Sequence, residues 1–288
     1  MRSATYAAAT FDYANARAVT DTLPTLEEYA AVFAAHGDSG AEYLRWHFPR
    51  FAATKQRLLS HGNRAAGNQI LDVGAHWLHQ TVLYAIDGFV VTALDLPATL
   101  DAESVRALAK AHSIRLLPND DLEYPAALKA IADDTFDLVL FTEIIEHLAF
   151  NPVAMWREIY RVMKPGARIV VTTPNYHALR TRLRRSWRAV RGLGAGVDVE
   201  HVLSVHTHGH HWKEYSRREL ERYFALLSPD FACQYFAYMK GSRRASARKP
   251  SVEIALLVER MIPFLRPDLY VEVELTRKAA GIVVEPHW

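Results

Sequence analysis

The sequence of 288 residues contains one cysteine, Cys233, and no long apolar run. A single cysteine excludes an internal disulfide framework and is typical of a protein from the reducing cytoplasm. The longest apolar runs, such as Phe136–Phe141 and Ile169–Val171, are far shorter than the roughly 18 residues that a membrane-spanning helix needs. The first residues, Met1–Tyr6, contain no apolar stretch of signal-peptide length. We therefore expect a cytoplasmic protein without a transmembrane segment.

The sequence also has little net charge and no internal repeat. Its 34 basic and 32 acidic residues leave a formal charge of +2, which is too small to indicate nucleic-acid binding by itself. Half of the residues are apolar and 23% are charged, which is the balance of a globular protein. This apolar content is sufficient for a core and excludes disorder as the main state.

From residue 68 onward, short apolar runs alternate with segments of helical periodicity. Strands that are apolar throughout are typical of a mostly parallel sheet covered by helices on both faces. The predicted strands are Ile70–Val73, Phe89–Leu94, Ile114–Leu117, Phe136–Phe141 and Arg168–Thr173. The predicted helices between them are Leu78–Ile86, Ala102–His112, Tyr124–Ala132 and Val153–Met163.

The sequence pattern at both ends of the chain differs from the strand–helix alternation of its middle. Residues 1–64 are predicted to form an N-terminal helical extension or cap, and 65–288 the main domain, with a lid inserted at about 176–215. Ser216 and Glu219 have the spacing of a capping box and predict a helix to Leu227. Beyond it we expect an antiparallel edge pair of strands, Phe231–Met239 and Leu269–Thr276, separated by a helix over Val252–Ile262.

Polar residues follow the first three predicted strands. Asp72 and Gly74 end the first strand, Asp95 ends the second, and the acidic segment 119–123 follows the third. In a doubly wound sheet, ligands bind beyond the carboxyl ends of the strands. A glycine there allows close approach of the backbone, and an acid after the second strand can accept hydrogen bonds from a ribose diol. A tight turn with ordinary strand-end aspartates remains an equal alternative.

Taken in order with the segments 136–148 and 163–175, these strings resemble the class I S-adenosylmethionine-dependent methyltransferases. The resemblance covers about residues 68–175 and, more loosely, 216–277. It implies an α/β fold with a Rossmann-like, seven-stranded, mostly parallel sheet. It also implies that S-adenosylmethionine is the cofactor, bound by Asp72, Gly74, Ala75, His76, Asp95, Leu96, Asp121, Leu122 and Thr142.

The glycine-rich loop departs from that family's pattern. The family has glycine at three alternating positions, whereas here Gly74 is followed by His76 and Leu78. Gly74, the glycine that matters most for backbone approach to the cofactor, is present. His76, Trp77 and His79 are expected at the mouth of the pocket and would narrow it. The altered loop keeps open a second interpretation, a non-catalytic cofactor-binding subunit of a partner enzyme.

A metal site is also predicted as one of two alternatives. Glu143, Glu146 and His147 have the spacing that places side chains on one face of a helix, and His211 lies in a histidine-rich stretch farther along the chain. Carboxylates and imidazoles suit a divalent ion such as manganese, iron, cobalt or zinc. The four residues resemble the metal-dependent small-RNA 2′-O-methyltransferases. The same segment also resembles metal-free relatives, including the ubiquinone-biosynthesis type.

The predicted function is O-methylation of a hydroxyl on a small molecule, sugar or glycoconjugate. A neutral hydroxyl is a poor nucleophile that needs a base or a metal, and His147, His211 and Glu146 are the candidate catalytic residues. The alternatives are a metal-dependent RNA ribose 2′-O-methyltransferase and a small-molecule N-methyltransferase. The sequence assigns no oligomeric state.

Six arginines between Arg180 and Arg191 mark a basic helix with an apolar stripe formed by Leu179, Leu183, Trp187 and Val190. One interpretation is a lid helix that packs this stripe on the core. The others are attraction of an acidic substrate, contact with a membrane surface, or contact with RNA backbone. RNA is disfavoured because the chain has no spare domain for recognising it. A second basic cluster lies at 243–249.

Overall fold

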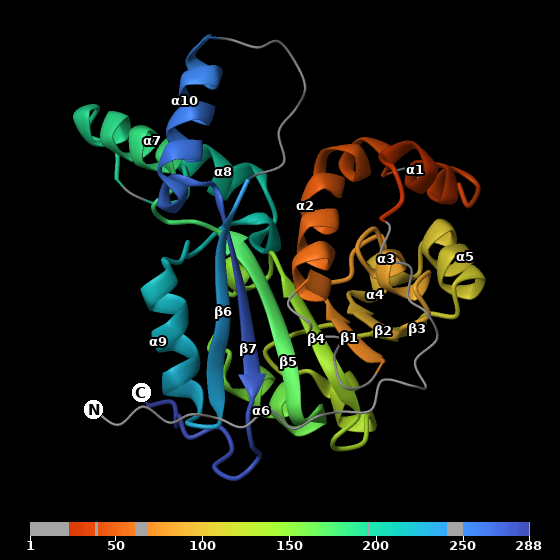
Figure 1. Cartoon of the computed structure of the whole chain (residues 1–288). Coiled ribbons are helices and arrows are strands. Elements are labelled where there is room, and N and C mark those ends of the chain that lie inside the picture. Colours follow the sequence, from red (N-terminus) through yellow and green to blue (C-terminus); the bar gives the residue numbers. More distant parts are fainter. Residues whose placement is uncertain (1–22, 38–39, 61–67, 195, 241–249, 288) are drawn as a thin grey trace.

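A seven-stranded sheet forms the centre of the computed structural model, which describes residues 23–37, 40–60, 68–194, 196–240 and 250–287 (Figure 1). The strand order is β3-β2-β1-β4-β5-β7-β6. Only β7 runs antiparallel to its neighbours in this sheet. The strands are β1 (Gln69–Val73), β2 (Val90–Asp95), β3 (Arg115–Pro118), β4 (Phe136–Thr142), β5 (Met163–Pro174), β6 (Phe231–Met239) and β7 (Asp268–Leu275). The predicted fold class and the antiparallel edge strands are confirmed.

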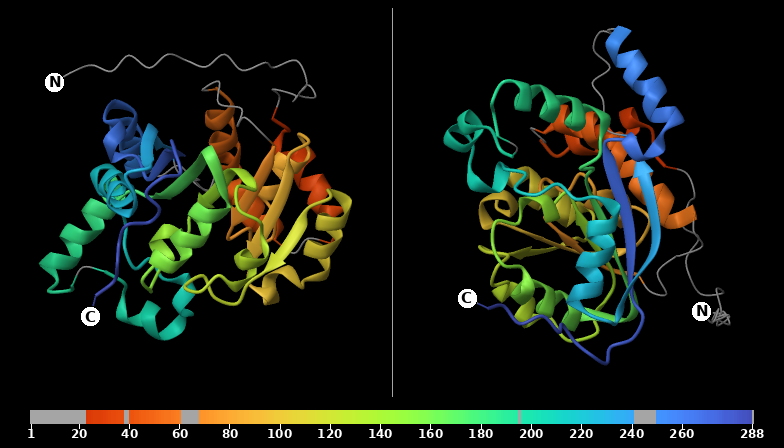
Figure 2. Two further views of the ribbon diagram at one scale, coloured as in Figure 1. Left: turned by 90° about the horizontal axis from the view of Figure 1, so that it is seen from below. Right: turned by 90° about the vertical axis from the view of Figure 1, so that its left-hand side faces the viewer.

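Helices cover both faces of the sheet (Figures 1 and 2). One face carries α1 (Leu26–Ala34), α2 (Ala41–Ser60), α3 (Thr81–Ala85), α4 (Pro97–Leu100) and α5 (Glu103–Ala111). The other face carries α6 (Val153–Val162) and α9 (Arg217–Leu227). Each layer has its own apolar core, so the sheet is buried on both sides as the apolar strands predicted.

Strand β4 shows how one segment serves both cores. Leu138 and Leu140 belong to the cluster under α1–α5, whereas Val139 and Phe141 belong to the cluster under α6 and α9. All four side chains are fully buried. Successive residues of a strand point to opposite faces, so a run that is apolar at every position fills both cores at once.

A buried ion pair connects α2 to the turn after α3. The Nζ atom of Lys55 lies 2.6 Å from a carboxylate oxygen of Asp87 and donates to the carbonyl oxygen of Leu83 at 2.7 Å. Burial of the Lys55 ammonium is tolerated because both partners are buried with it. This contact holds the last turns of α2 against α3, while the turns before Lys55 reach the carboxyl ends of the strands (Figure 1).

Two predicted helices are shorter than expected. The helix predicted from Leu78 begins only at Thr81, because Leu78 has a φ of +64° that is incompatible with an α-helix. The helix predicted over Tyr124–Ala132 is the 3₁₀ segment η1 (Ala126–Ala130), which begins directly after Pro125. In contrast, the capping box of α9 is confirmed: Ser216 and Glu219 each accept from the other's backbone N–H.

The predicted insertion contains α7 (Leu179–Val190), α8 (Val199–Ser204) and η3 (Thr207–Gly209). Of the interpretations of α7, the one that packs its apolar stripe on the core is wrong, since none of its residues is buried and Leu183, Trp187 and Val190 are exposed. Helix α10 (Pro250–Met261) and η4 (Pro263–Leu265) precede β7. The basic cluster at 243–249 lies outside the described residues. In the described part of the chain, no helix is long and apolar enough to cross a membrane.

Candidate active site

A cavity of about 600 Å³ opens at the carboxyl ends of β1, β2 and β4. Strands β1 and β4 are the pair at which the direction of chain progression through the sheet reverses, the usual ligand position in such sheets. All nine residues predicted to bind the cofactor line this cavity: Asp72, Gly74, Ala75, His76, Asp95, Leu96, Asp121, Leu122 and Thr142. Of the three residues expected at its mouth, His76 and His79 line it, whereas Trp77 does not.

The loop after β1 keeps left-handed backbone at all three positions where the family has glycine. Gly74 has a φ of +74°, His76 of +49° and Leu78 of +64°. A Cβ atom on Gly74 would lie 2.1 Å from Ile144 Cδ1, so a larger residue at this left-handed position would displace the Ile144 side chain. At the other two positions the chain accepts a strain of roughly 1 kcal/mol each. The sequence departure therefore changes the side chains of the loop, while φ stays positive at all three positions.

Two aspartates at the strand ends are held by specific hydrogen bonds. Asp72 is buried and accepts from the hydroxyl of Thr81 at 2.7 Å, and burial raises its pKa to about 7. Asp95 accepts from the backbone N–H of His76 at 2.7 Å and from that of Leu96 at 2.6 Å. These bonds fix the Asp95 carboxylate at the cavity wall.

The acidic segment after β3 is also ordered by its own contacts. The amide of Asn119 donates to the carbonyl oxygen of Asp121 at 2.6 Å and accepts from the N–H of Ala127 at 3.1 Å. Asp121 in turn accepts from the N–H of Glu123 at 2.7 Å. The backbone at Asp121 and Leu122 is thereby set against the cavity.

Arg50 is a site residue that the sequence did not indicate. It projects from α2 into the cavity wall, and its Nη1 atom lies 3.0 Å from Oε2 of Glu143. Nε of Arg50 and Oε1 of Glu143 make no hydrogen bond in the described structure. The only local signal was an arginine beside the buried face of α2, next to Phe51. Its partner follows β4, so no pattern within α2 could have revealed the pair.

Glu143 therefore does not join the predicted metal ligands, and it does not share a helix with them. It has a φ of +56°, and only Ile145–His147 form a short 3₁₀ helix, η2. The prediction that Glu143, Glu146 and His147 share one face of a helix is wrong. The N–H of Glu143 still donates to the carbonyl oxygen of Thr172 in β5. This bond extends the sheet contact past the end of β4 and delays the turn.

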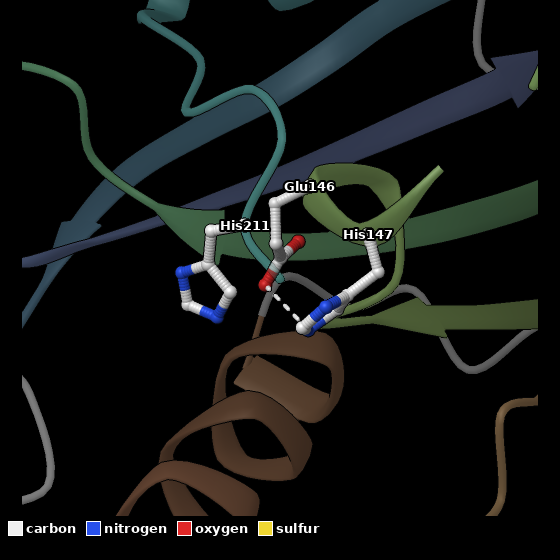
Figure 3. Close-up of side chains that lie close together, drawn as sticks. All are labelled: Glu146, His147 and His211. Atoms are coloured by element: carbon white, nitrogen blue, oxygen red, sulfur yellow. Dashed lines mark ion pairs between the residues drawn. The ribbon is translucent and has the colours of Figure 1, made fainter. Parts of the chain in front are cut away.

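The other three residues do converge (Figure 3). Ligand atoms of Glu146, His147 and His211 lie within 4.8 Å of one another. The segment that carries His211 is held here because the N–H of Trp212 donates to the carbonyl oxygen of Glu146 at 2.8 Å. His147 lines the cavity, whereas Glu146 lies behind it and is fully buried.

The hydrogen bonds of this cluster leave two atoms available. Oε2 of Glu146 accepts from the hydroxyl of Thr173 at 2.9 Å, while Oε1 accepts no hydrogen bond in the described structure and lies 3.9 Å from Nε2 of His147. Nδ1 of His147 lies 3.0 Å from the carbonyl oxygen of His210. A carbonyl only accepts, so Nδ1 carries the proton and Nε2 keeps its lone pair.

The charges of the cluster are set by burial. Burial lowers the pKa of His147, and the neighbouring His211 lowers it further, so His147 is neutral at pH 7. Burial also lowers the pKa of His211. The pKa of Glu146 is raised well above its usual range by burial and by the negative charge of Glu143. Because the positive charge of an imidazolium favours ionisation of a neighbouring carboxyl, a proton taken up by the neutral His147 would favour the carboxylate form of Glu146 as its counter-charge.

Comparison with known sequences gives related methyltransferases. A family model described as "Methyltransferase domain" matches residues 43–227, more than half of the chain. The ubiquinone biosynthesis O-methyltransferase of Pseudomonas putida is 29% identical over 157 residues, which are 53% of this chain and 60% of that protein. The Azotobacter vinelandii protein of the same name is 29% identical over 114 residues, or 39% and 47% of the two chains. The match thus spans less than two thirds of these relatives.

Solved structures show the same fold at low sequence identity. A chain in the complex between the Haloferax volcanii Trm112 methyltransferase activator and a putative methyltransferase superposes with a TM-score of 0.55 at 17% identity. The alignment covers 87% of this chain and 98% of that one. The PH0226 protein of Pyrococcus horikoshii gives a TM-score of 0.50 at 15% identity over 79% and 90% of the chains. These likenesses concern the fold alone.

Proposed function

Because the chain belongs to the methyltransferase-domain family, within the class I S-adenosylmethionine-dependent methyltransferases, we propose that it methylates a hydroxyl of a small molecule or sugar. The relatives named as O-methyltransferases support this choice of acceptor. The observation that carries the proposal is the position of His147. Its ring lines the cavity with Nε2 unprotonated and a buried carboxyl, Glu146, beside it.

In the proposed reaction, the acceptor oxygen attacks the methyl carbon of the sulfonium in line with the bond to sulfur. The carbon–oxygen bond forms as the carbon–sulfur bond breaks, and S-adenosylhomocysteine leaves with the electron pair. The hydroxyl proton moves to Nε2 of His147, whose imidazolium is then stabilised by Glu146 at 3.9 Å. Alignment of the two reactants and exclusion of water contribute much of the remaining rate enhancement.

In this proposal, polar side chains of the cavity wall complement the charged and polar groups of the cofactor. Its amino-acid end is a zwitterion, and the Arg50–Glu143 pair offers one charge of each sign, with one unused polar atom on each side chain. Asp95 would accept from the ribose hydroxyls, and Asp121 would meet the adenine amino group. These strand-end residues would then contact one ligand, bound in the cavity of about 600 Å³.

A divalent metal is a second arrangement that the same cluster supports. Oε1 of Glu146, which accepts no hydrogen bond in the described residues, faces the imidazoles of His147 and His211, a donor set suited to zinc or manganese. These three residues would hold the ion, which would acidify a bound hydroxyl. The Nδ1 contact of His147 with a carbonyl oxygen is the support that metal-binding histidines usually have.

Titration with S-adenosylhomocysteine, on protein whose metal content is known, tests the cofactor site first. Transfer of a radiolabelled methyl group to a panel of phenols, sugars, amines and RNA then tests the acceptor class. Labelling of hydroxyl acceptors supports the proposal, and labelling of amines or RNA alone contradicts it. Binding without labelling of any acceptor would favour the non-catalytic subunit. Activity that survives prolonged chelation removes the metal arrangement but leaves the His147 base intact.

A further inference from the structure

Helix α7 combines exposed apolar side chains with a high density of arginine. The exposed fractions are 62% for Leu183, 60% for Trp187 and 88% for Val190. The segment 179–191 contains six arginines and no acidic residue. An amphipathic helix of this composition, with leucine and tryptophan on one face and arginine on the other, is typical of segments that lie in a membrane interface.

A second apolar face lies at the same end of the molecule. Helix α10 exposes 64% of Ile254, 58% of Leu257 and 73% of Met261. In Figure 1 and in the right view of Figure 2, α7 and α10 both project beyond the carboxyl-terminal edge of the parallel strands. Helix α7 contacts η4, the segment that follows α10: the guanidinium of Arg182 lies 5.8 Å from the centre of the Phe264 ring.

The charges of α7 indicate which kind of partner this surface would bind. Two acidic residues already pair with arginines of α7, since Arg185 pairs with Glu214 and Arg188 pairs with Asp198. Arg180 and Arg184 are exposed and form no ion pair in the described structure. Arg191 lies over the Trp187 ring at 4.6 Å, which places a cation beside the one aromatic ring of the helix. An apolar protein partner would leave these arginines without counter-charges, whereas anionic headgroups supply them.

We propose that the exposed faces of α7 and α10 form a docking surface for an anionic lipid bilayer. The surface is defined by Leu183, Trp187, Val190, Ile254, Leu257 and Met261, with Arg180 and Arg184 at its charged border. Its position at the strand ends that carry the cavity would bring the active site to the lipid surface. This inference goes beyond the proposed reaction and does not depend on it.

Co-sedimentation of the full chain with vesicles tests the proposal. We expect binding to vesicles of phosphatidylcholine with phosphatidylglycerol, little binding to phosphatidylcholine alone, and weaker binding as salt increases. Each arginine near an anionic surface contributes about fivefold to partitioning, so Arg180→Glu with Arg184→Glu should reduce it at least roughly 25-fold. Leu183→Ser with Trp187→Ser should also reduce it, because the apolar insertion is lost.

Matched controls come from exposed residues of α9, a helix that is not part of the proposed docking surface. Leu226→Ser replaces a leucine that is 56% exposed, and Arg218→Glu with Arg222→Glu reverses two exposed charges. Both control variants should bind vesicles like the unaltered protein, and every variant should retain its affinity for S-adenosylhomocysteine. Absence of binding to anionic vesicles would overturn the proposal. So would equal loss in the α9 variants, or self-association that disappears in the Leu183→Ser, Trp187→Ser variant.

Discussion

The guanidinium of Arg50 and the carboxylate of Glu143 lie 3.0 Å apart at the cavity wall, one from helix α2 and one from the turn after β4. The pair joins the helical segment before the sheet to the end of a central strand. Glu143 adopts a left-handed turn, with a φ of +56°, and its carboxylate is not among the converging ligand atoms of Glu146, His147 and His211. One ion pair thereby contributes both charges to the wall of the cavity that His147 also lines.

Removing either partner should destabilise the protein more than removing both. Arg50→Met or Glu143→Gln alone leaves a charge with little water around it, and we expect a loss of about 3 kcal/mol in the free energy of unfolding. The double variant should recover part of this loss. Urea unfolding of the three variants and the unaltered protein gives the coupling energy, and additive losses would contradict a stabilising pair.

The fold could be predicted from the sequence because it depends on local patterns. The apolar run of β4, for example, specifies a strand buried on both faces wherever it is placed. The Arg50–Glu143 pair could not be predicted, because it depends on how α2 packs across the sheet. The spacing of Glu143, Glu146 and His147 suggested a helix, but spacing alone does not report the left-handed turn at Glu143. The apolar stripe of α7 was found correctly, yet periodicity does not say whether such a stripe meets the core or the solvent.

His147→Ala should reduce turnover far more than cofactor binding. Loss of a general base typically costs a factor of 10² to 10⁴ in rate, so we expect at least about a hundredfold lower kcat with S-adenosylhomocysteine affinity within about threefold. His112→Ala, at the end of α5 on the surface layer, is the matched control and should keep full turnover. A fall in cofactor affinity as large as the fall in kcat would instead place His147 at the cofactor.

Glu146→Gln keeps the shape of the side chain and an oxygen to accept from Thr173, but it removes the carboxyl that stabilises the imidazolium. We therefore expect kcat to fall by about tenfold to a hundredfold and the pH profile of kcat to change with it. The comparison needs steady-state rates across pH for the variant and the unaltered protein. A variant with the same rate and the same profile would leave Glu146 with a structural role only.

Asp72 should make stability fall as pH rises. Its folded pKa of about 7 lies above the unfolded value of 3.8, so the folded protein binds more protons between these values. This contribution to the free energy of unfolding is fully present below about pH 4 and is lost as the pH rises through about 7. It amounts to at most roughly 4 kcal/mol. Urea unfolding of Asp72→Asn between pH 5 and about 7.5 should show a flatter dependence, whereas Asp101→Asn, at an exposed carboxyl, should not. Equal slopes in all three proteins would contradict the raised pKa.

Position 76 should prefer glycine to alanine, which reverses the usual order. Both substitutions remove the imidazole from its contacts with Tyr43 and Trp77, but only glycine relieves the left-handed φ of +49°. We expect His76→Gly to be about 1 kcal/mol more stable than His76→Ala in urea unfolding. At Lys110, on the exposed surface of α5, the same pair should rank in the opposite order by a similar amount. His76→Gly should also retain cofactor affinity, because the N–H of residue 76 still donates to Asp95.

The prediction is contradicted if His76→Ala is as stable as His76→Gly or more stable. The loop would then relax to an ordinary backbone conformation, and the protein in solution would lack the left-handed φ at this position.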